Sequence, residues 1–165
     1  MKQITRIRLL ICFFIIALIL SGITAFPVET ELRWLLAHPR LIPDAFMPWL
    51  QHVHDALLET NSKYPMLAYG FDWLAFAHIV IAMAFIGPLK DPVRNQWIID
   101  WAILACLAVI PLAFIAGPVR QIPMFHIMID CNFGIIGLIP LFICRRWIQK
   151  LAIQQKVNFG IVSTL

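Results

Sequence analysis

The chain alternates four long apolar runs with shorter polar segments. The runs lie near residues 9–26, 66–87, 97–117 and 122–144. A helix of about 20 residues crosses a hydrocarbon core of about 30 Å, and each run is close to that length. Within a bilayer a helix also satisfies its own backbone polar groups. The pattern therefore predicts an all-α fold, a polytopic membrane protein with four transmembrane helices.

The first run has a second interpretation. Lys2, Arg6 and Arg8 precede it, so residues 1–26 also resemble a secretory signal peptide with a cleavage site after Ala25. Ile23 is unfavourable near such a site, where small residues are preferred. The run is also nearly long enough to cross a membrane. We therefore predict an uncleaved first span.

The segment between the first two runs, residues 28–64, is interrupted by three prolines and offers no long apolar window. We expect it to lie outside the membrane. Glu29 and Glu31 suit the first turn of a short helix through Ala37, because carboxylates stabilise a helix N-terminus. A second, amphipathic helix is predicted near residues 44–60, of the kind that lies on a bilayer or covers the ends of the spans. Its apolar stripe consists of Phe46, Trp49, Leu50, Val53 and Leu57.

Composition supports the same class. Hydrophobic residues make up 61% of the chain and charged residues 13%, whereas soluble proteins carry about 25% charged residues. A length of 165 residues suits a single membrane domain, residues 1–165. The net charge is +4 and the pI about 9.1, but the basic residues lie at the ends of the runs. That placement indicates membrane orientation and argues against nucleic-acid binding.

Orientation follows from the lysines and arginines. They gather before residue 9, in the loop 88–96 and after residue 144, and with four spans these regions share one side. The positive-inside rule makes that side the cytoplasm, so we expect both termini to be cytoplasmic and residues 28–64 to be outside. Asp100 begins the third run, where we expect it to cap the helix or to pair with Arg94.

Ionisable residues inside the runs are the candidate site. We expect Asp72, Arg120, His126 and Asp130 to form a polar cluster near the outer side, because an ionisable group within a span costs on the order of 2.5–3.5 kcal/mol on insertion scales. The cluster either fixes the helices by ion pairing or forms a small-ligand, proton or cation site.

Small residues suggest how the cluster is brought together. Gly134 and Gly137 share a helix face with Asp130, and Ala75 shares one with Asp72. Small residues let two membrane helices approach closely. We therefore expect spans two and four to meet along these faces, with Asp130 close to Arg120 or to Asp72.

Histidines and cysteines give weaker signals. His78 and His126 are the alternative axial ligands of a b-type haem, but their depths differ by nearly 14 Å at helical rise, which disfavours the pair. His38, His52 and His54 lie in the outer segment, where solvated side chains are the favoured interpretation. No metal site is predicted. The four cysteines have no Cys-x-x-Cys spacing, and we interpret them as apolar packing residues, with a Cys106–Cys131 contact left open.

Several stretches resemble a known group of proteins. They are the residues 71–78, Phe-Asp-Trp-Leu-Ala-Phe-Ala-His, the loop 87–95, and Ile122-Pro123 followed by Asp130 and residues 134–137. Over about residues 64–147 the chain resembles an uncharacterised family of small four-span inner-membrane proteins of Bacteroidota-like bacteria. The resemblance implies a bacterial inner membrane and supplies no activity.

Taken together, these patterns favour a non-enzymatic protein of the inner membrane. We expect a structural role or that of an accessory subunit, with the lipid bilayer and other membrane subunits as partners. A cofactor is expected only under the haem alternative.

Overall fold

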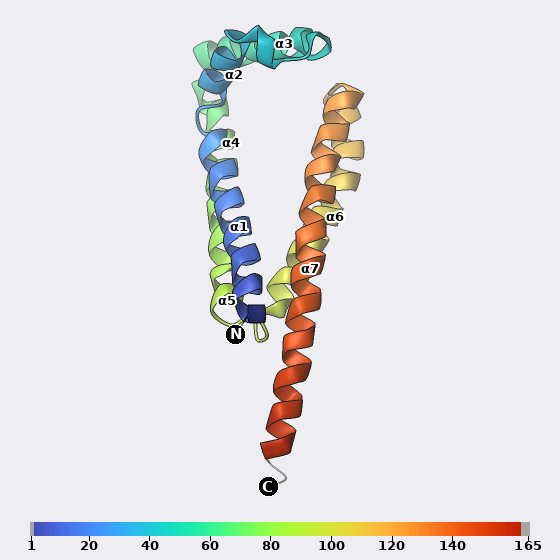
Figure 1. The fold of residues 1–165 in the computed structure, drawn as a ribbon. Helices are drawn as coiled ribbons and strands as arrows, with labels where there is room; N and C mark the ends of the chain where they lie inside the picture. Colours follow the sequence, from blue (N-terminus) through green and yellow to red (C-terminus); the bar gives the residue numbers. More distant parts are fainter. Residues whose placement is uncertain (1, 163–165) are drawn as a thin grey trace. The chain divides into compact units, whose positions relative to one another are not determined.

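The computed structural model describes residues 2–162, and within this range it is helical and contains no strand. The long helices are α1 (Lys2–Ala25), α4 (Tyr69–Ala84), α6 (Gln96–Val119) and α7 (Met124–Val162) (Figure 1). The shorter ones are α2 (Val28–Leu36), α3 (Met47–Lys63) and α5 (Ile86–Lys90), with single 3-10 turns at Pro39–Leu41, Asp44–Phe46 and Pro65–Ala68. The predicted all-α fold is confirmed.

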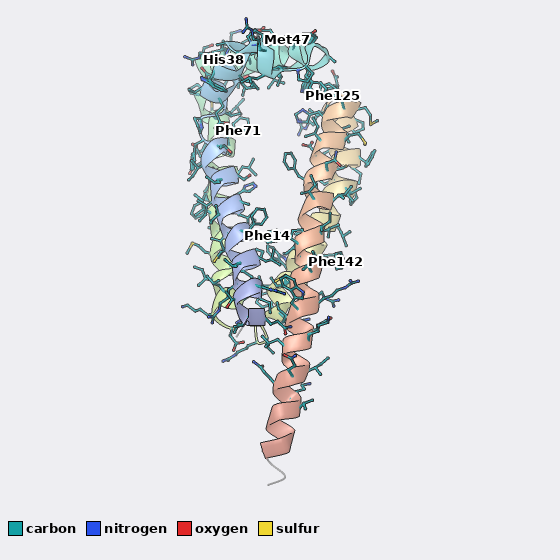
Figure 2. The ribbon with its side chains drawn as sticks, viewed as in Figure 1. Phe14, His38, Met47, Phe71, Phe125 and Phe142 are labelled. Carbon is teal, nitrogen blue, oxygen red and sulfur yellow. The ribbon has the colours of Figure 1, made fainter. Side chains whose placement is uncertain are left out.

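Four helical segments are long and apolar enough to cross a membrane. They are Gln3–Ala25, Pro65–Lys90, Gln96–Val119 and Met124–Val157. Each overlaps one of the four predicted runs along most of its length. Large apolar side chains stand exposed along them, among them Phe71 on α4 and Phe142 on α7 (Figure 2). Such a surface is typical of helices that face lipid or other proteins.

The last helix is longer than its apolar run. The predicted fourth span ends near residue 144, and α7 continues beyond that point to Val162. Residues 145–157 contain mainly Arg, Gln, Lys, Leu, Ala and Ile and no glycine or proline. These are mostly good helix formers, so nothing in this stretch stops the helix.

The chain divides into two compact units. Unit 1 consists of Met1–Phe14 and Ala84–Leu165, and unit 2 of Ile15–Met83. Helix α1 contributes its first half to unit 1 and its second half to unit 2. The single membrane domain over residues 1–165 stays a prediction.

Unit 1 is built on the antiparallel pair α6 and α7. Its core is formed by buried side chains from α1, α5, α6, α7 and the residue before α5: Ile7, Ile11, Phe85, Pro88, Ile99, Ile127, Leu141, Cys144 and Ile148. The rings of Phe14 and Phe85 stack with centroids 5.8 Å apart. These contacts attach the beginning of α1 to the α6–α7 pair.

A tight turn joins α6 to α7. The amide of Ile122 donates to the carbonyl of Gly117 and that of Gln121 to Pro118, while Gln121 has a φ of 58°. This is a Schellman motif, in which a left-handed residue ends the helix. The turn reverses the chain within a few residues.

Unit 2 contains the second half of α1, the outer helices α2 and α3, and α4. Gly22 of α1 lies so close to α4 that a Cβ atom there would be 2.8 Å from the carbonyl oxygen of Ala75. Helix α3 contacts α2 and the turn at Pro65–Ala68. The five residues of its predicted apolar stripe are all at least partly buried, so the stripe packs as the amphipathic pattern indicated.

Candidate functional site

Part of the predicted polar cluster lies on one helix of unit 1. The Nε2 atom of His126 is 3.8 Å from Oδ1 of Asp130, one turn further along α7, and both side chains are about two-fifths exposed. Arg120 is the C-cap of α6. Among the described residues no ion pair joins Arg120 to Asp130. The Schellman turn separates the two helices between these residues, and His126 on the same helix is nearer to Asp130. The alternative contact of Asp130 with Asp72 stays a prediction because the two residues belong to different units.

The predicted close face of span four is also corrected. A Cβ atom on Gly134 would lie 2.7 Å from the carbonyl oxygen of Cys106, and one on Gly137 would lie 3.1 Å from the Cys106 sulfur. These glycines therefore pack against α6, the third span. Ala75 is buried and its carbonyl oxygen faces Gly22 of the first span. The expected contact of spans two and four along these faces is therefore replaced by contacts with the third and the first span.

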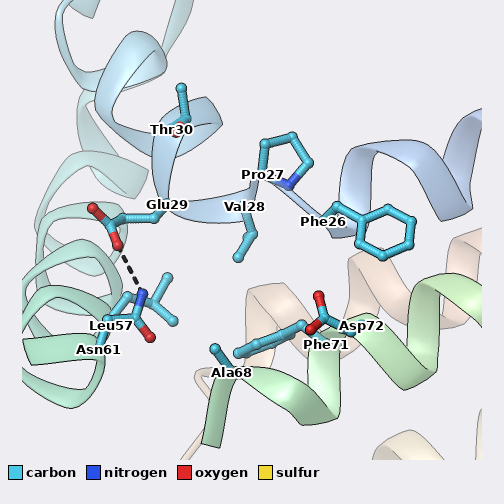
Figure 3. Close-up of a pocket in the computed structure, with 10 residues that line it drawn as sticks. All are labelled: Phe26, Pro27, Val28, Glu29, Thr30, Leu57, Asn61, Ala68, Phe71 and Asp72. Atoms are coloured by element: carbon cyan, nitrogen blue, oxygen red, sulfur yellow. Dashed lines mark hydrogen bonds between the residues drawn. The ribbon is translucent and has the colours of Figure 1, made fainter. Parts of the chain in front are cut away.

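Asp72 belongs to unit 2, where it lines a pocket. The pocket has a volume of about 230 Å³ and lies where α1 passes into α2, with α3 and α4 forming the other walls (Figure 3). Its polar lining consists of two carboxylates, one amide and one hydroxyl, those of Glu29, Asp72, Asn61 and Thr30. Apolar residues complete it: Phe26, Pro27, Val28, Leu57, Ala68 and Phe71. Asp72 has no hydrogen-bond or ion-pair partner among the described residues of this unit.

Among the polar groups that line the pocket, Glu29 is bound by two side chains of the protein. The Asn61 amide donates a hydrogen bond of 2.7 Å to one carboxylate oxygen (Figure 3). Arg33 contacts the other oxygen at 3.0 Å. These contacts link the first turn of α2 to the end of α3. The Asn61 hydrogen bond, with a smaller contribution from Arg33, lowers the pKa of Glu29 below its usual value against the opposing effect of desolvation.

This lowered pKa predicts a pH dependence. A carboxyl with a lower pKa in the folded state stabilises the fold above its unfolded pKa of about 4.3, and that contribution is lost as the pH falls through the folded value. We expect the thermal midpoint of helix loss, followed by circular dichroism in mild detergent, to fall between pH 6 and 3. In Glu29→Gln this fall should be smaller.

The matched control is Glu31→Gln, which removes an exposed carboxylate from the same turn of α2. The thermal midpoint of this variant should change with pH as that of the unchanged protein does. If the thermal midpoint changes equally with pH in Glu29→Gln and in Glu31→Gln, the Asn61 contact contributes nothing specific to stability.

Three further contacts in unit 1 join segments far apart in the sequence. The Gln3 amide donates to the carbonyl of Trp147 at 2.9 Å. The Arg8 guanidinium donates to the carbonyls of Leu89 and Lys90 at 3.1 and 3.2 Å. They fasten the start of α1 to α7 and to the end of α5.

The third contact is an ion pair between α6 and α7. Nε of Arg145 lies 2.5 Å from Oδ1 of Asp100, and the Gln96 amide lies 3.4 Å from the other carboxylate oxygen. The expected Asp100–Arg94 pair is not formed; the backbone amide of Arg94 donates to Asp91 instead. The sequence placed Asp100 in the first turn of a helix but carried no signal for a partner 45 residues away.

Histidines of the two units make local contacts. Nδ1 of His78 in unit 2 lies 2.8 Å from the carbonyl of Leu74, and His126 belongs to unit 1. In the outer segment His38 is exposed, with Nδ1 2.8 Å from the Trp34 carbonyl. The side chain of His54 is only 13% exposed, which corrects the expectation that it is solvated. It lies on the half of α3 that packs against the rest of unit 2.

All four cysteines are free thiols; Cys131 and Cys144 are buried, and Cys12 and Cys106 are partly buried. Within the part of the chain that the structure describes, no three His, Cys, Asp or Glu side chains are grouped so as to hold a metal ion.

Comparison of the chain with protein-family models, with curated proteins and with solved structures found no match.

Proposed function

We propose that the chain is a multi-pass protein of a bacterial inner membrane that acts without catalysis, as a structural component or an accessory subunit. One observation carries this proposal. Polar side chains at one end of unit 1, Gln3, Arg8 and the Asp100–Arg145 pair, connect segments that are distant in the sequence. These side chains join helices to one another, which supports a structural role for them.

The surface of the spans supports a role beside other subunits. Large apolar side chains remain exposed on α1, α4, α6 and α7. The carboxylate of Asp130 stands partly exposed within the last candidate span. A carboxylate directed at lipid is costly, so this face favours a polar protein neighbour. An accessory subunit has such a neighbour.

The positions of lysines and arginines support the orientation. The N-terminal residues, the loop after α5 and the basic part of α7 carry most of them. By the positive-inside rule these regions are cytoplasmic, and α2 and α3 are on the outer side.

Purification in a mild detergent tests the proposed role. We expect the protein to migrate above its monomer mass of 18.9 kDa after correction for bound detergent, with a second membrane protein in fixed ratio. A monomer without a co-purifying protein contradicts the accessory role. The absorbance spectrum of the same sample tests the haem alternative, since a Soret band would support ligation by histidine.

Thiol labelling in intact cells tests the orientation. Ser62→Cys places an accessible thiol at the end of α3, and Gln154→Cys places one on the exposed part of α7. We expect a membrane-impermeant maleimide to label only the first from outside. The reverse pattern overturns the orientation, and labelling of both from outside overturns the number of spans.

A further inference from the structure

Charge is distributed unequally between the two units. Every lysine and arginine of the chain lies in unit 1 except Arg33, Arg40 and Lys63, whereas most of the acidic residues lie in unit 2. In unit 1 the acidic residues are Asp91, Asp100 and Asp130. Unit 1 is therefore strongly basic, more so than the net charge of the whole chain suggests.

Contacts within unit 1 place most of these cations at one end. Gln3 bonds to the carbonyl of Trp147, Arg8 to the end of α5, and Arg145 to Asp100 near the start of α6. The start of α1, the end of α5, the start of α6 and residues 145–147 of α7 are therefore level with one another. The ribbon shows α7 continuing beyond that level (Figure 1).

Two cations at this end, Arg8 and Arg145, are bound to other parts of the protein. Five others have exposed side chains that make no hydrogen bond or ion pair with any residue that the structure describes. We call these five the basic belt: Arg6, Lys90, Arg94, Arg146 and Lys150.

Tryptophans lie at the same level. Trp97 and Trp101 occupy the first turns of α6 with 65% and 41% of their surface exposed, and Trp147 is on α7 beside the basic belt. Tryptophan is enriched where hydrocarbon meets headgroups, because its ring is apolar and its N–H is polar. The tryptophans indicate that the belt lies at headgroup depth.

The length of α7 gives the same depth independently. Residues 124–144 make about 32 Å of helix at 1.5 Å per residue, which matches a hydrocarbon core of about 30 Å. Arg146 and Lys150 follow directly, so they emerge among the headgroups when α7 crosses the membrane.

We propose that the basic belt binds the headgroups of anionic phospholipids in the leaflet that this end of unit 1 faces. The inference rests on the proposed membrane location. The inference is based on charge complementarity between the belt and anionic headgroups. The belt is a group of exposed cations with few anions nearby, at headgroup depth and level with tryptophans. The negative lipid surface attracts each lysine or arginine by an amount that corresponds to about fivefold in affinity. The ligand chemistry is a phosphodiester with net negative charge.

Lipid titration followed by native mass spectrometry tests the proposal. The full chain in a neutral detergent is titrated separately with phosphatidylglycerol and phosphatidylcholine. We expect tighter binding of phosphatidylglycerol, and in Arg146→Gln/Lys150→Gln we expect this preference to fall at least tenfold. The matched control, Arg40→Gln/Lys63→Gln, removes two exposed cations from unit 2 and should change the preference less than twofold.

A measurement on the unchanged protein covers the case in which the double variant fails to fold. Raising the salt from 50 to 500 mM should weaken phosphatidylglycerol binding, since exposed charges are screened, and leave phosphatidylcholine binding nearly unchanged. Equal affinity for the two lipids, or equal loss in the belt and control variants, overturns the proposal. So does capture of an acidic soluble protein by the belt without any lipid preference.

The failure of this inference can be told apart from that of the proposed function. A chain released from membranes by alkaline carbonate is not an integral membrane protein, and that result overturns the proposed location. A chain that resists carbonate but shows no preference for anionic lipid overturns the lipid inference alone.

Discussion

Gly134→Ala is expected to destabilise the α6–α7 pair by about 1–3 kcal/mol, the range for inserting a group into a packed interface. The added Cβ atom would lie 2.7 Å from the carbonyl oxygen of Cys106. A backbone oxygen cannot rotate away as a side chain does, so the two helices have to separate. Alanine is otherwise the better helix former by about 1 kcal/mol, which makes a net loss diagnostic of the contact.

Two other glycines complete a graded series. A Cβ on Gly137 would meet the Cys106 sulfur at 3.1 Å, and one on Gly70 would meet nothing within 4 Å. We expect Gly137→Ala to have a smaller effect than Gly134→Ala, and Gly70→Ala to be neutral or slightly stabilising. If Gly134→Ala is as stable as Gly70→Ala, the close approach of α6 and α7 at this point is wrong.

The native cysteines provide the measurement for this series. Cys131 and Cys144 are 6% and 1% exposed, so they react with a fluorogenic maleimide mainly when the helices come apart. The temperature at which labelling accelerates in mild detergent reports the stability of unit 1. The expected order is Gly134→Ala lowest, then Gly137→Ala, then Gly70→Ala.

The second large effect concerns the Asp100–Arg145 pair. Its two side chains are 41% and 40% exposed and meet at 2.5 Å across α6 and α7. Removing one partner leaves the other charge at the edge of an apolar bundle. We expect Arg145→Gln and Asp100→Asn each to cost about 1–2 kcal/mol, between the values for surface and buried pairs. The double variant should lose less than the sum of the two single losses.

The control pair is Glu59–Lys63 on α3, which meets at 2.6 Å but is 67% and 60% exposed. Its coupling should be only about 0.3–0.5 kcal/mol, as in other exposed pairs one turn apart. The same thiol-labelling melt can follow the Asp100–Arg145 cycle, and circular dichroism can follow both. Strictly additive losses at Asp100 and Arg145 would show that the pair adds no coupling energy.

Two kinds of contact join α6 to α7 in unit 1. Charged side chains join them at one end, and small residues allow close packing further along. At the level of Asp100 the helices are joined by an ion pair, and at Cys106 they are in backbone contact with Gly134. Polar contacts fit the membrane boundary, where water is near, and glycine contacts fit the interior, where close packing is the main attraction between helices. The arrangement supports the view that these charges are structural.

The helices themselves were predictable from the sequence. Run length and hydropathy are local properties, and they located the four long helices and the amphipathic α3 with its stripe of Phe46, Trp49, Leu50, Val53 and Leu57. The loss of apolar character after residue 144 predicts the end of the fourth span but not the end of the helix, because α7 continues to Val162. Helix formation requires only suitable backbone propensity, which residues 145–157 retain.

Pairing between helices was decided by the tertiary structure. The sequence indicated that Gly134 and Ala75 lie on faces that allow close approach, but the structure assigned them to different neighbours, Cys106 on α6 and Gly22 on α1. The same holds for the polar groups: Asp100 meets Arg145, and Glu29 meets Asn61 in the pocket that Asp72 lines. Helical periodicity tells which residues share a face, whereas the identity of the opposite helix depends on how all the faces pack at once, and no local pattern contains that information.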